Sequence, residues 1–178
     1  TRHRHASHLL GLYPGNAITD KTPELIEACK VSLLDRGFGQ KSGANGSGWG
    51  KANKVNLWAR AKDGNRAYSM LRELINKNIA PNLWDFHPPY QMDGNCGYTS
   101  GVCEMLCYSS DDIIELLPAL PEEWKNGSVK GLCARGGYSL DFTWENGEIK
   151  SLSVYSSCGK KTARIKTGDE IKTVKTVG

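Results

Sequence analysis

"KANKVNLWARAKDGNRAYSMLRELINKN", residues 51–78, decides the first half of the fold. Apolar residues recur at helical spacing in its first part, where Val55 and Trp58 share a stripe. A second stripe, which includes Met70 and Leu74, follows an Asp-Gly pair. A connection of about two residues predicts two antiparallel helices packed side by side.

The segments on either side also predict helices. Thr22 followed by Pro23 is typical of a helix start, and Gly37 is suited to end that helix. A further helix is expected to begin shortly after Gly97, with Met105 turned inward. The first part of the chain is therefore predicted to be a helical scaffold.

The pattern changes near residue 120, where alternation of apolar and polar residues replaces the helical spacing. Asn146-Gly147 lies between two alternating runs and is a strong signal for a two-residue β-hairpin turn. We expect antiparallel β structure from about residue 127 to the end.

Composition excludes several classes of protein. With 39% hydrophobic and 24% charged residues, the chain has the composition of a globular protein rather than a disordered one. No apolar run approaches the ~20 residues of a membrane span. The net charge of +4 is dispersed and has no aromatic platform beside it, so no nucleic-acid partner is expected. A start on Thr within a motif suggests a fragment.

The cysteines show no C-x-x-C pair and no zinc spacing, so they are expected to be reduced, small apolar residues. Cys103 and Cys107 are predicted to share one face of a helix. No metal and no cofactor are expected. The six cysteines are Cys29, Cys96, Cys103, Cys107, Cys133 and Cys158.

Three long Gly- or Pro-rich loops interrupt the helices, and such loops are where binding groups usually lie. The first holds His3, His5 and His8 beside Arg2 and Arg4. A metal site, a structural role and contact with a ligand all remain open for the histidines, although no acidic or cysteine partner supports a metal. At least one Arg/His pair is expected to face a ligand, because Arg donates a planar fork of hydrogen bonds.

The second loop, "GANGSGWGK" (residues 43–51), resembles a phosphate-binding loop only loosely, because it lacks the required Gly-Lys-Ser/Thr spacing. Trp49 is either a binding platform or a plug in the core.

The third loop, "HPPYQMDGNCG" (residues 87–97), brings His87, Asp93 and Asn95 close together in sequence. Asp93 is either a turn-stabilising residue or an acid/base carboxylate held by a stiff loop. The aromatic residues just before it suit either a sugar site or an anchor for the loop.

Four stretches together resemble the C-terminal part of glycoside hydrolase family 95, over residues 2 to about 160. That family contains bacterial and plant α-L-fucosidases, including 1,2-α-L-fucosidases, and some α-L-galactosidases. The stretches are "HRHASHLLGLYPGN", "GWGKANKVNLWARAKDGNRAYSML", "NLWDFHPPYQMDGNCGYTSGVCEML" and "LLPALPEEWKNGSVKGLCARGGYSLDFTWENG".

The resemblance implies an α+β, multi-domain fragment. Residues 1–118 would be the last helices of an (α/α)6 barrel, and residues 119–178 would belong to a C-terminal antiparallel β-sandwich. The missing N-terminal part of the same polypeptide would be the first partner, and a fucosylated glycan the second.

The resemblance also implies an inverting exo-α-L-fucosidase, hydrolysing terminal and chiefly α-1,2 linkages. Asp93 matches the residue that polarises an upstream Asn, which contacts the water. The general acid, a Glu, would lie before residue 1, so the fragment alone is expected to be inactive. Arg4, His5 and His87 match sugar-binding positions, and Trp49 and Asn95 are expected to line the pocket.

Alternatives remain from the sequence. The chain departs from the family pattern at Gly50, Asn53 and Cys96, which affects the expected shape of the pocket rim. An α-L-galactosidase of the same family, or a non-catalytic carbohydrate-binding or structural fragment, would carry the same motifs. Localisation is open: many bacterial relatives are secreted or surface-bound, whereas cysteines without a pairing pattern also fit the cytoplasm.

Overall fold

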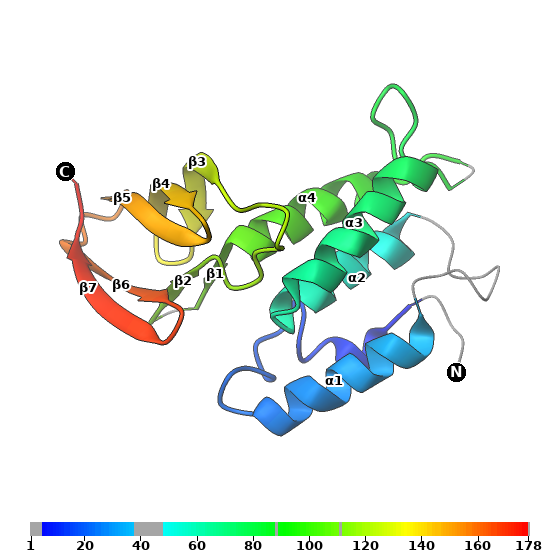
Figure 1. Cartoon of the computed structure of the whole chain (residues 1–178), viewed down its shortest axis with the longest axis horizontal. Helices are drawn as coiled ribbons and strands as arrows, with labels where there is room; N and C mark the ends of the chain where they lie inside the picture. Colours follow the sequence, from blue (N-terminus) through cyan, green and yellow to red (C-terminus); the bar gives the residue numbers. More distant parts are fainter. Residues whose placement is uncertain (1–4, 38–47, 88, 111, 178) are drawn as a thin grey trace.

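A computed structural model describes residues 5–37, 48–87, 89–110 and 112–177. Helices occupy one side of the molecule and strands the other, which confirms the predicted α+β class (Figure 1). Among the described residues, no helix has the length and apolar character that crossing a bilayer requires. The helical elements are η1 (Ser7–Leu9), α1 (Pro23–Arg36), α2 (Trp49–Arg60), α3 (Gly64–Asn78) and α4 (Met92–Leu106).

Helix α2 is the centre of the helical part, and it packs against both α3 and α4. Its approach to α4 is close because α4 presents glycine: a Cβ on Gly101 would lie 2.6 Å from Cγ1 of Val55. The buried Asn56 joins the two helices by donating to the Gly97 carbonyl at 2.8 Å and accepting from Ser100 Oγ at 3.0 Å. A satisfied polar link of this kind fixes how the two helices pack.

Most predicted helix ends are confirmed, and one is wrong. Helix α1 begins at Pro23 and is followed by Gly37 at φ 66°, while α2 and α3 are joined by three residues rather than two. Helix α4 begins at Met92, before the predicted start after Gly97. Glycine has a low helix propensity, so Gly94 and Gly97 favoured a loop in the prediction. In the structure both lie inside α4, where other segments pack too closely for a larger residue.

The strands form two sheets, a four-stranded sheet in the order β1-β2-β6-β7 and a three-stranded sheet in the order β3-β4-β5. Among the strands of the described residues, every pair is antiparallel except β2 with β6, which is parallel. The strands are β1 (Cys107–Ser109), β2 (Ile114–Leu116), β3 (Gly127–Ala134), β4 (Tyr138–Glu145), β5 (Glu148–Ser156), β6 (Thr162–Thr167) and β7 (Glu170–Lys175).

The predicted β-hairpin is confirmed, because Asn146 and Gly147 join β4 to β5 with φ values of 51° and 79°. The two sheets share one apolar core, with Phe142 and Val154 from one sheet and Ile165 from the other. Strands β1 and β2 were not predicted. Cys107 therefore lies in β1, and the expectation that it shares a helix face with Cys103 is wrong.

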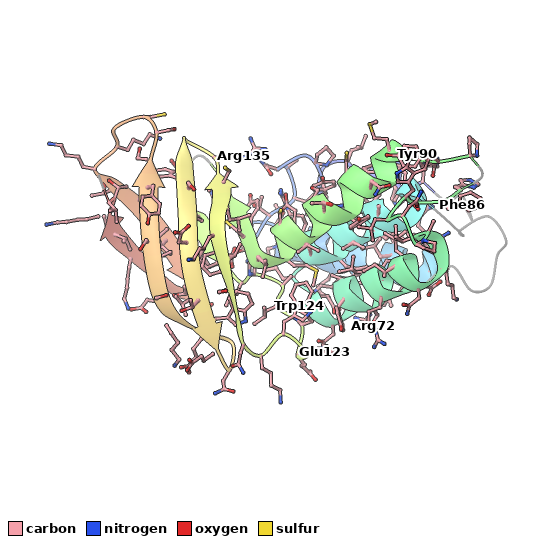
Figure 2. The ribbon with its side chains drawn as sticks, turned by 90° about the horizontal axis from the view of Figure 1, so that it is seen from above. Arg72, Phe86, Tyr90, Glu123, Trp124 and Arg135 are labelled. Carbon is pink, nitrogen blue, oxygen red and sulfur yellow. The ribbon has the colours of Figure 1, made fainter. Side chains whose placement is uncertain are left out.

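Trp124 lies at the junction between the helices and the strands (Figure 2). It packs against both hydrophobic cores, and its ring meets that of Tyr68 edge to face at 5.7 Å between centroids. Its carbonyl also accepts a hydrogen bond from Nε1 of Trp144 at 2.8 Å. One aromatic residue thus joins the two parts.

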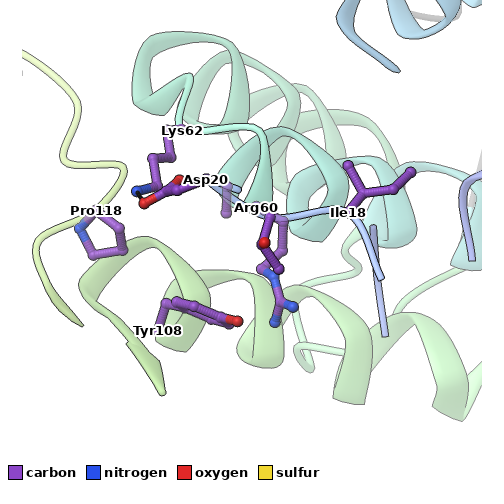
Figure 3. Close-up of a pocket in the computed structure, with 8 residues that line it drawn as sticks. Ile18, Asp20, Arg60, Lys62, Tyr108 and Pro118 are labelled. Atoms are coloured by element: carbon purple, nitrogen blue, oxygen red, sulfur yellow. Dashed lines mark hydrogen bonds and ion pairs between the residues drawn. The ribbon is translucent and has the colours of Figure 1, made fainter. Parts of the chain in front are cut away.

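A ring of alternating charges crosses the same junction. Lys62 Nζ lies 2.6 Å from Asp20 and 2.8 Å from Glu115, and Lys166 Nζ lies 2.7 Å and 3.1 Å from the same two carboxylates. Figure 3 shows Asp20 and Lys62 beside Arg60, around a cavity of about 20 Å³. This space holds about one water molecule, so it is a packing gap rather than a ligand site.

Candidate functional site

The loop between α3 and α4, residues 79–91, lies at the end of the helical part farthest from the strands (Figure 1). It folds back on itself, because Ile79 and Asp85 form an antiparallel bridge. The N–H of Phe86 also donates to the carbonyl of Asn78 at 2.6 Å. The loop is therefore a small structured hairpin.

Two residues of the QMDGN stretch hold this loop against the helices. Gln91 donates its N–H to the Asp85 carbonyl at 3.1 Å, and its Oε1 accepts from the Trp49 N–H at 3.3 Å. Asn95 accepts from the Asp85 N–H at 2.7 Å and donates to the Leu83 carbonyl at 2.8 Å. These bonds join the loop to the starts of α2 and α4.

Gly94 and Gly97 allow other groups to approach the first turns of α4. A Cβ on Gly94 would lie 1.4 Å from Oδ2 of Asp85, a distance that no side chain could tolerate without movement. A Cβ on Gly97 would lie 2.9 Å from the ring of Trp49. The small residues of the motif thus make room for Asp85 and Trp49.

Asp93, the predicted catalytic carboxylate, is exposed on the first turn of α4. Its Oδ1 accepts a hydrogen bond from the N–H of Gly94 at 3.0 Å. Negative charge is favoured at the N-terminus of a helix, where backbone N–H groups point outward. Asp93 is therefore held by a fixed turn and stays accessible to a ligand or to another polar group.

An exposed aromatic cluster, formed by Trp84, Phe86 and Tyr90, lies in the same loop. These side chains are 54%, 52% and 38% exposed, and the rings of Trp84 and Tyr90 lie 4.8 Å apart. Figure 2 shows Phe86 and Tyr90 at the end of the helices remote from the sheets. His87, next to Phe86, is half-buried. Flat apolar surface and polar groups are thus adjacent.

Asp85 is the functional candidate that sequence reasoning missed. It is fully buried, and neither carboxylate oxygen has a hydrogen-bond partner among the described residues. Burial first, and the negative charge of Asp93 second, raise the pKa of Asp85 above its usual range. One feature of the sequence could have identified Asp85: it is a carboxylate within the otherwise apolar stretch "LWDF", residues 83–86.

The structure brings Asp93, Asn95, His87 and Trp49 to one end of the helices through the contacts above. Trp49 is half-buried, with its ring against α4, which leaves both a platform and a plug compatible with its position. His5, a predicted sugar-binding residue, lies near the end of α1, where its carbonyl accepts a hydrogen bond from the guanidinium of Arg36 at 3.2 Å. Arg4, like Arg2 and His3, lies outside the described residues.

Metal binding and disulfides find no support in the described part of the chain. No group of three His, Cys, Asp or Glu residues there is arranged to hold a metal ion. All six cysteines are free, but only Cys29 is buried as a small apolar residue, so that expectation is wrong for the four exposed ones. Burial, with nearby negative charge, raises the pKa of Cys107 to about 12.

Comparison with known families gives two matches along the chain. Residues 1–106 match the glycosyl hydrolase family 95 catalytic domain. Residues 108–177 match the glycoside hydrolase family 95 C-terminal domain. The point between the matches coincides with the passage from α4 to β1.

Individual relatives agree with these matches. The chain is 38% identical to alpha-L-fucosidase 2 of Arabidopsis thaliana, over 86% of this chain and 19% of that protein. It is 35% identical to probable alpha-fucosidase A of Aspergillus oryzae and 33% identical to that of Aspergillus niger, over 81% and 92% of this chain. These relatives are eukaryotic, and the chain spans about a fifth of their length, 19% to 23%. With both of its halves matched, the chain belongs to glycoside hydrolase family 95.

Proposed function

We propose that this chain is the C-terminal piece of an inverting exo-α-L-fucosidase that removes terminal α-1,2-linked fucosyl groups from glycans. Family membership and the relatives' names support a fucosidase. The observation that carries the assignment to this part of the enzyme is Asp93, exposed on a clamped helix turn beside exposed aromatic rings.

For the architecture, we propose that the helices are the last ones of an (α/α)6 barrel and the strands a β-sandwich. The two family matches and the apolar core shared by the sheets support this division. The proposed division assigns residues 1–118 to the barrel and residues 119–178 to the β-sandwich.

The proposed chemistry needs a general acid on the leaving oxygen and a base that activates water on the opposite face. The acid, a Glu, would come from the preceding part of the polypeptide. Asp93 would accept a hydrogen bond from the amide N–H of an upstream Asn. The amide oxygen of that Asn then becomes a stronger acceptor for a proton of the attacking water, which makes the water oxygen more nucleophilic. An exposed carboxylate on a fixed turn suits that role, because the partner must reach it from outside this chain.

Sugar binding is proposed for the residues that match the family's sugar-binding positions and for two residues near the start of α4. Arg4, His5 and His87 would donate to the hydroxyls, and Trp49 would line the pocket rim. Asn95 donates one amide hydrogen to the Leu83 carbonyl, and we assign its second amide hydrogen to the ligand.

The deciding experiment compares wild-type full-length protein with Asp93→Asn on 2′-fucosyl and α-L-galactosyl substrates. We expect kcat to fall by about 10²–10⁴-fold, since the group that activates the water is lost. Asp169→Asn, an exposed change in the turn between β6 and β7, is the matched control. Turnover by Asp93→Asn at the wild-type rate would remove Asp93 from the mechanism. Preference for the galactoside would keep the mechanism and change the sugar.

The isolated chain provides a second test. Without the general acid, hydrolysis should be weaker than that of the full-length protein by at least about 10²-fold. A nitrophenyl fucoside assay on both proteins measures this ratio. Equal turnover would show that the acid lies within these residues.

A further inference from the structure

Asp85 stands apart from the other buried polar groups. Within the described ranges, its two oxygens are the only buried side-chain nitrogen or oxygen atoms without a hydrogen-bond partner. The residue is 0% exposed, so nothing outside this chain can reach the carboxyl without displacing the surrounding atoms. An ionised carboxylate in such a place is costly, because burial removes it from solvent and neither of its oxygens accepts a hydrogen bond from the described residues.

The nearby cation Lys51 is a weak counter-charge for Asp85. Lys51, on α2, is buried and directs its ammonium to Glu73 at 3.1 Å and to Oδ1 of Asn78 at 2.8 Å. The N–H of Phe86 lies near the Asp85 carboxyl and favours its charged form, although the hydrogen bond of this N–H goes to the carbonyl of Asn78 at 2.6 Å. Lys51 and the Phe86 N–H therefore each have another partner, and their effect on Asp85 is smaller than that of burial.

Two further titratable groups face Asp85. His87, in the same loop, favours the charged form, whereas Asp93, on the first turn of α4, opposes it. Burial is the largest influence, and it acts in the same direction as Asp93. The balance of burial and charges at this position thus favours a proton on Asp85.

We propose that Asp85 is a neutral carboxylic acid that positions Asp93, leaving Asp93 as the single negative charge on the first turn of α4. This inference rests on the proposed role of Asp93. Oδ2 of Asp85 fills the space that a side chain on Gly94 would occupy, next to Asp93 in the chain. A charged Asp85 would place a second negative charge under the same turn, and a shorter residue would leave the turn unsupported.

The charge state can be tested without a substrate, by measuring the thermal midpoint of full-length wild type and Asp85→Asn against pH. A carboxyl whose pKa is raised by folding destabilises the folded state increasingly as the pH rises above its unfolded value, about 3.9. Asp85→Asn should therefore gain stability relative to wild type as the pH rises above about 4, until the pH passes the raised pKa of the folded state. Asp169→Asn is the control for removal of an exposed carboxylate.

Two results would overturn the neutral carboxyl. One is an Asp85→Asn protein that is less stable than wild type at neutral pH and matches it in acid, which is the behaviour of an ionised, partnered carboxylate. The other is a stability difference that does not change with pH. An infrared carbonyl band of a protonated carboxyl, present at neutral pH and lost in Asp85→Asn, is the positive spectroscopic signature.

The positioning role is tested by rescue with the conservative variant. Asp85→Ala should lower kcat by about 10²-fold with little change in KM, because Asp93 loses its placement. Asp85→Asn should lose much less, since the amide keeps the shape of a neutral carboxyl. Equal losses in both variants, or a change confined to KM, would overturn the positioning role.

The two proposals fail in different ways. If Asp93→Asn leaves kcat unchanged, the proposed function fails, while the pH dependence of stability still reports whether Asp85 is neutral. If Asp93→Asn abolishes turnover but Asp85→Asn behaves as a lost ion pair, the function stands and the inference about Asp85 is wrong.

Discussion

The two ends of α2 differ in how nearby charged side chains are paired. Beyond its C-terminal end, Lys62 and Lys166 alternate with Asp20 and Glu115 in a closed ring of ion pairs. At its N-terminal end, the carboxyl of Asp85 is buried and has no hydrogen-bond partner in the described part of the chain, and exposed aromatic rings lie nearby.

The difference separates a structural contact from a site. Paired charges at the junction hold the strands to the helices and leave little for a ligand to add. The opposite end holds what a functional site needs: an accessible carboxylate, exposed rings and a buried carboxyl whose pKa is shifted by its surroundings. Each of the following experiments alters one end and leaves the other as its reference.

The largest expected effect is at the N-terminal end of α2, from Gly94→Ala. The new methyl group would overlap the carboxyl of Asp85, so we expect a loss of about 3 kcal/mol in the free energy of unfolding. Chemical denaturation of the full-length protein measures the change. Gly11→Ala is the control, since its methyl group would lie 3.5 Å from the nearest side-chain atoms of Ile18.

A double variant tests whether Asp85 is the cause. Asp85→Ala combined with Gly94→Ala should cost less than the sum of the two single changes, because shortening Asp85 removes the overlap. Simple additivity would place the strain of Gly94→Ala elsewhere in the turn.

A smaller effect is expected at the junction, from Glu115→Gln. Glu115 is buried and accepts from both lysines of the ring, so loss of its charge should cost about 2 kcal/mol of unfolding free energy. Denaturation of the variant tests this value. Glu148→Gln, in the exposed pair with Lys150, should leave the midpoint unchanged and serves as the control.

The smallest effect concerns Asp20, which is about half exposed. Burial opposes its charged form, but hydrogen bonds from Lys166 and Lys62 outweigh burial and lower its pKa. The stabilisation is therefore present above about pH 4 and is lost as the pH falls through the lowered pKa. Because solvent screens the pair, Asp20→Asn should cost only about 0.5 kcal/mol at neutral pH.

The measurement for Asp20 is the unfolding free energy from neutral pH into acid. The gap between wild type and Asp20→Asn should close as the pH falls, and added salt should narrow it at neutral pH. A gap that widens in acid would show that the ring does not stabilise the charged carboxylate.

The sequence predicted those features whose causes are local. Thr22-Pro23, Gly37 and Asn146-Gly147 act through their own backbone preferences, and each marks an element boundary in the structure. The start of α4 was mispredicted because its glycines are required by close contact with Asp85 and Trp49, which belong to other segments.

Other features were beyond local patterns. Strands β1 and β2 have three residues each, too few to show a period, and β2 also pairs with β6, which is distant in sequence. For the site, the motifs identified the region of Asp93. Asp85 is buried because its loop meets the starts of α2 and α4. The spacing of residues within one segment cannot reveal such a meeting.

The parallel pairing of β2 with β6 has a consequence for the order in which this protein acquires its structure. During synthesis, the helices and β2 emerge before the whole β3-β4-β5 sheet and β6. Glu115 and Lys62 therefore exist long before Lys166 arrives to complete the ring of charges. Until β6 is synthesised, the edge of β2 that pairs with it stays unpaired. We expect a chaperone that covers such an edge to be most useful in that interval.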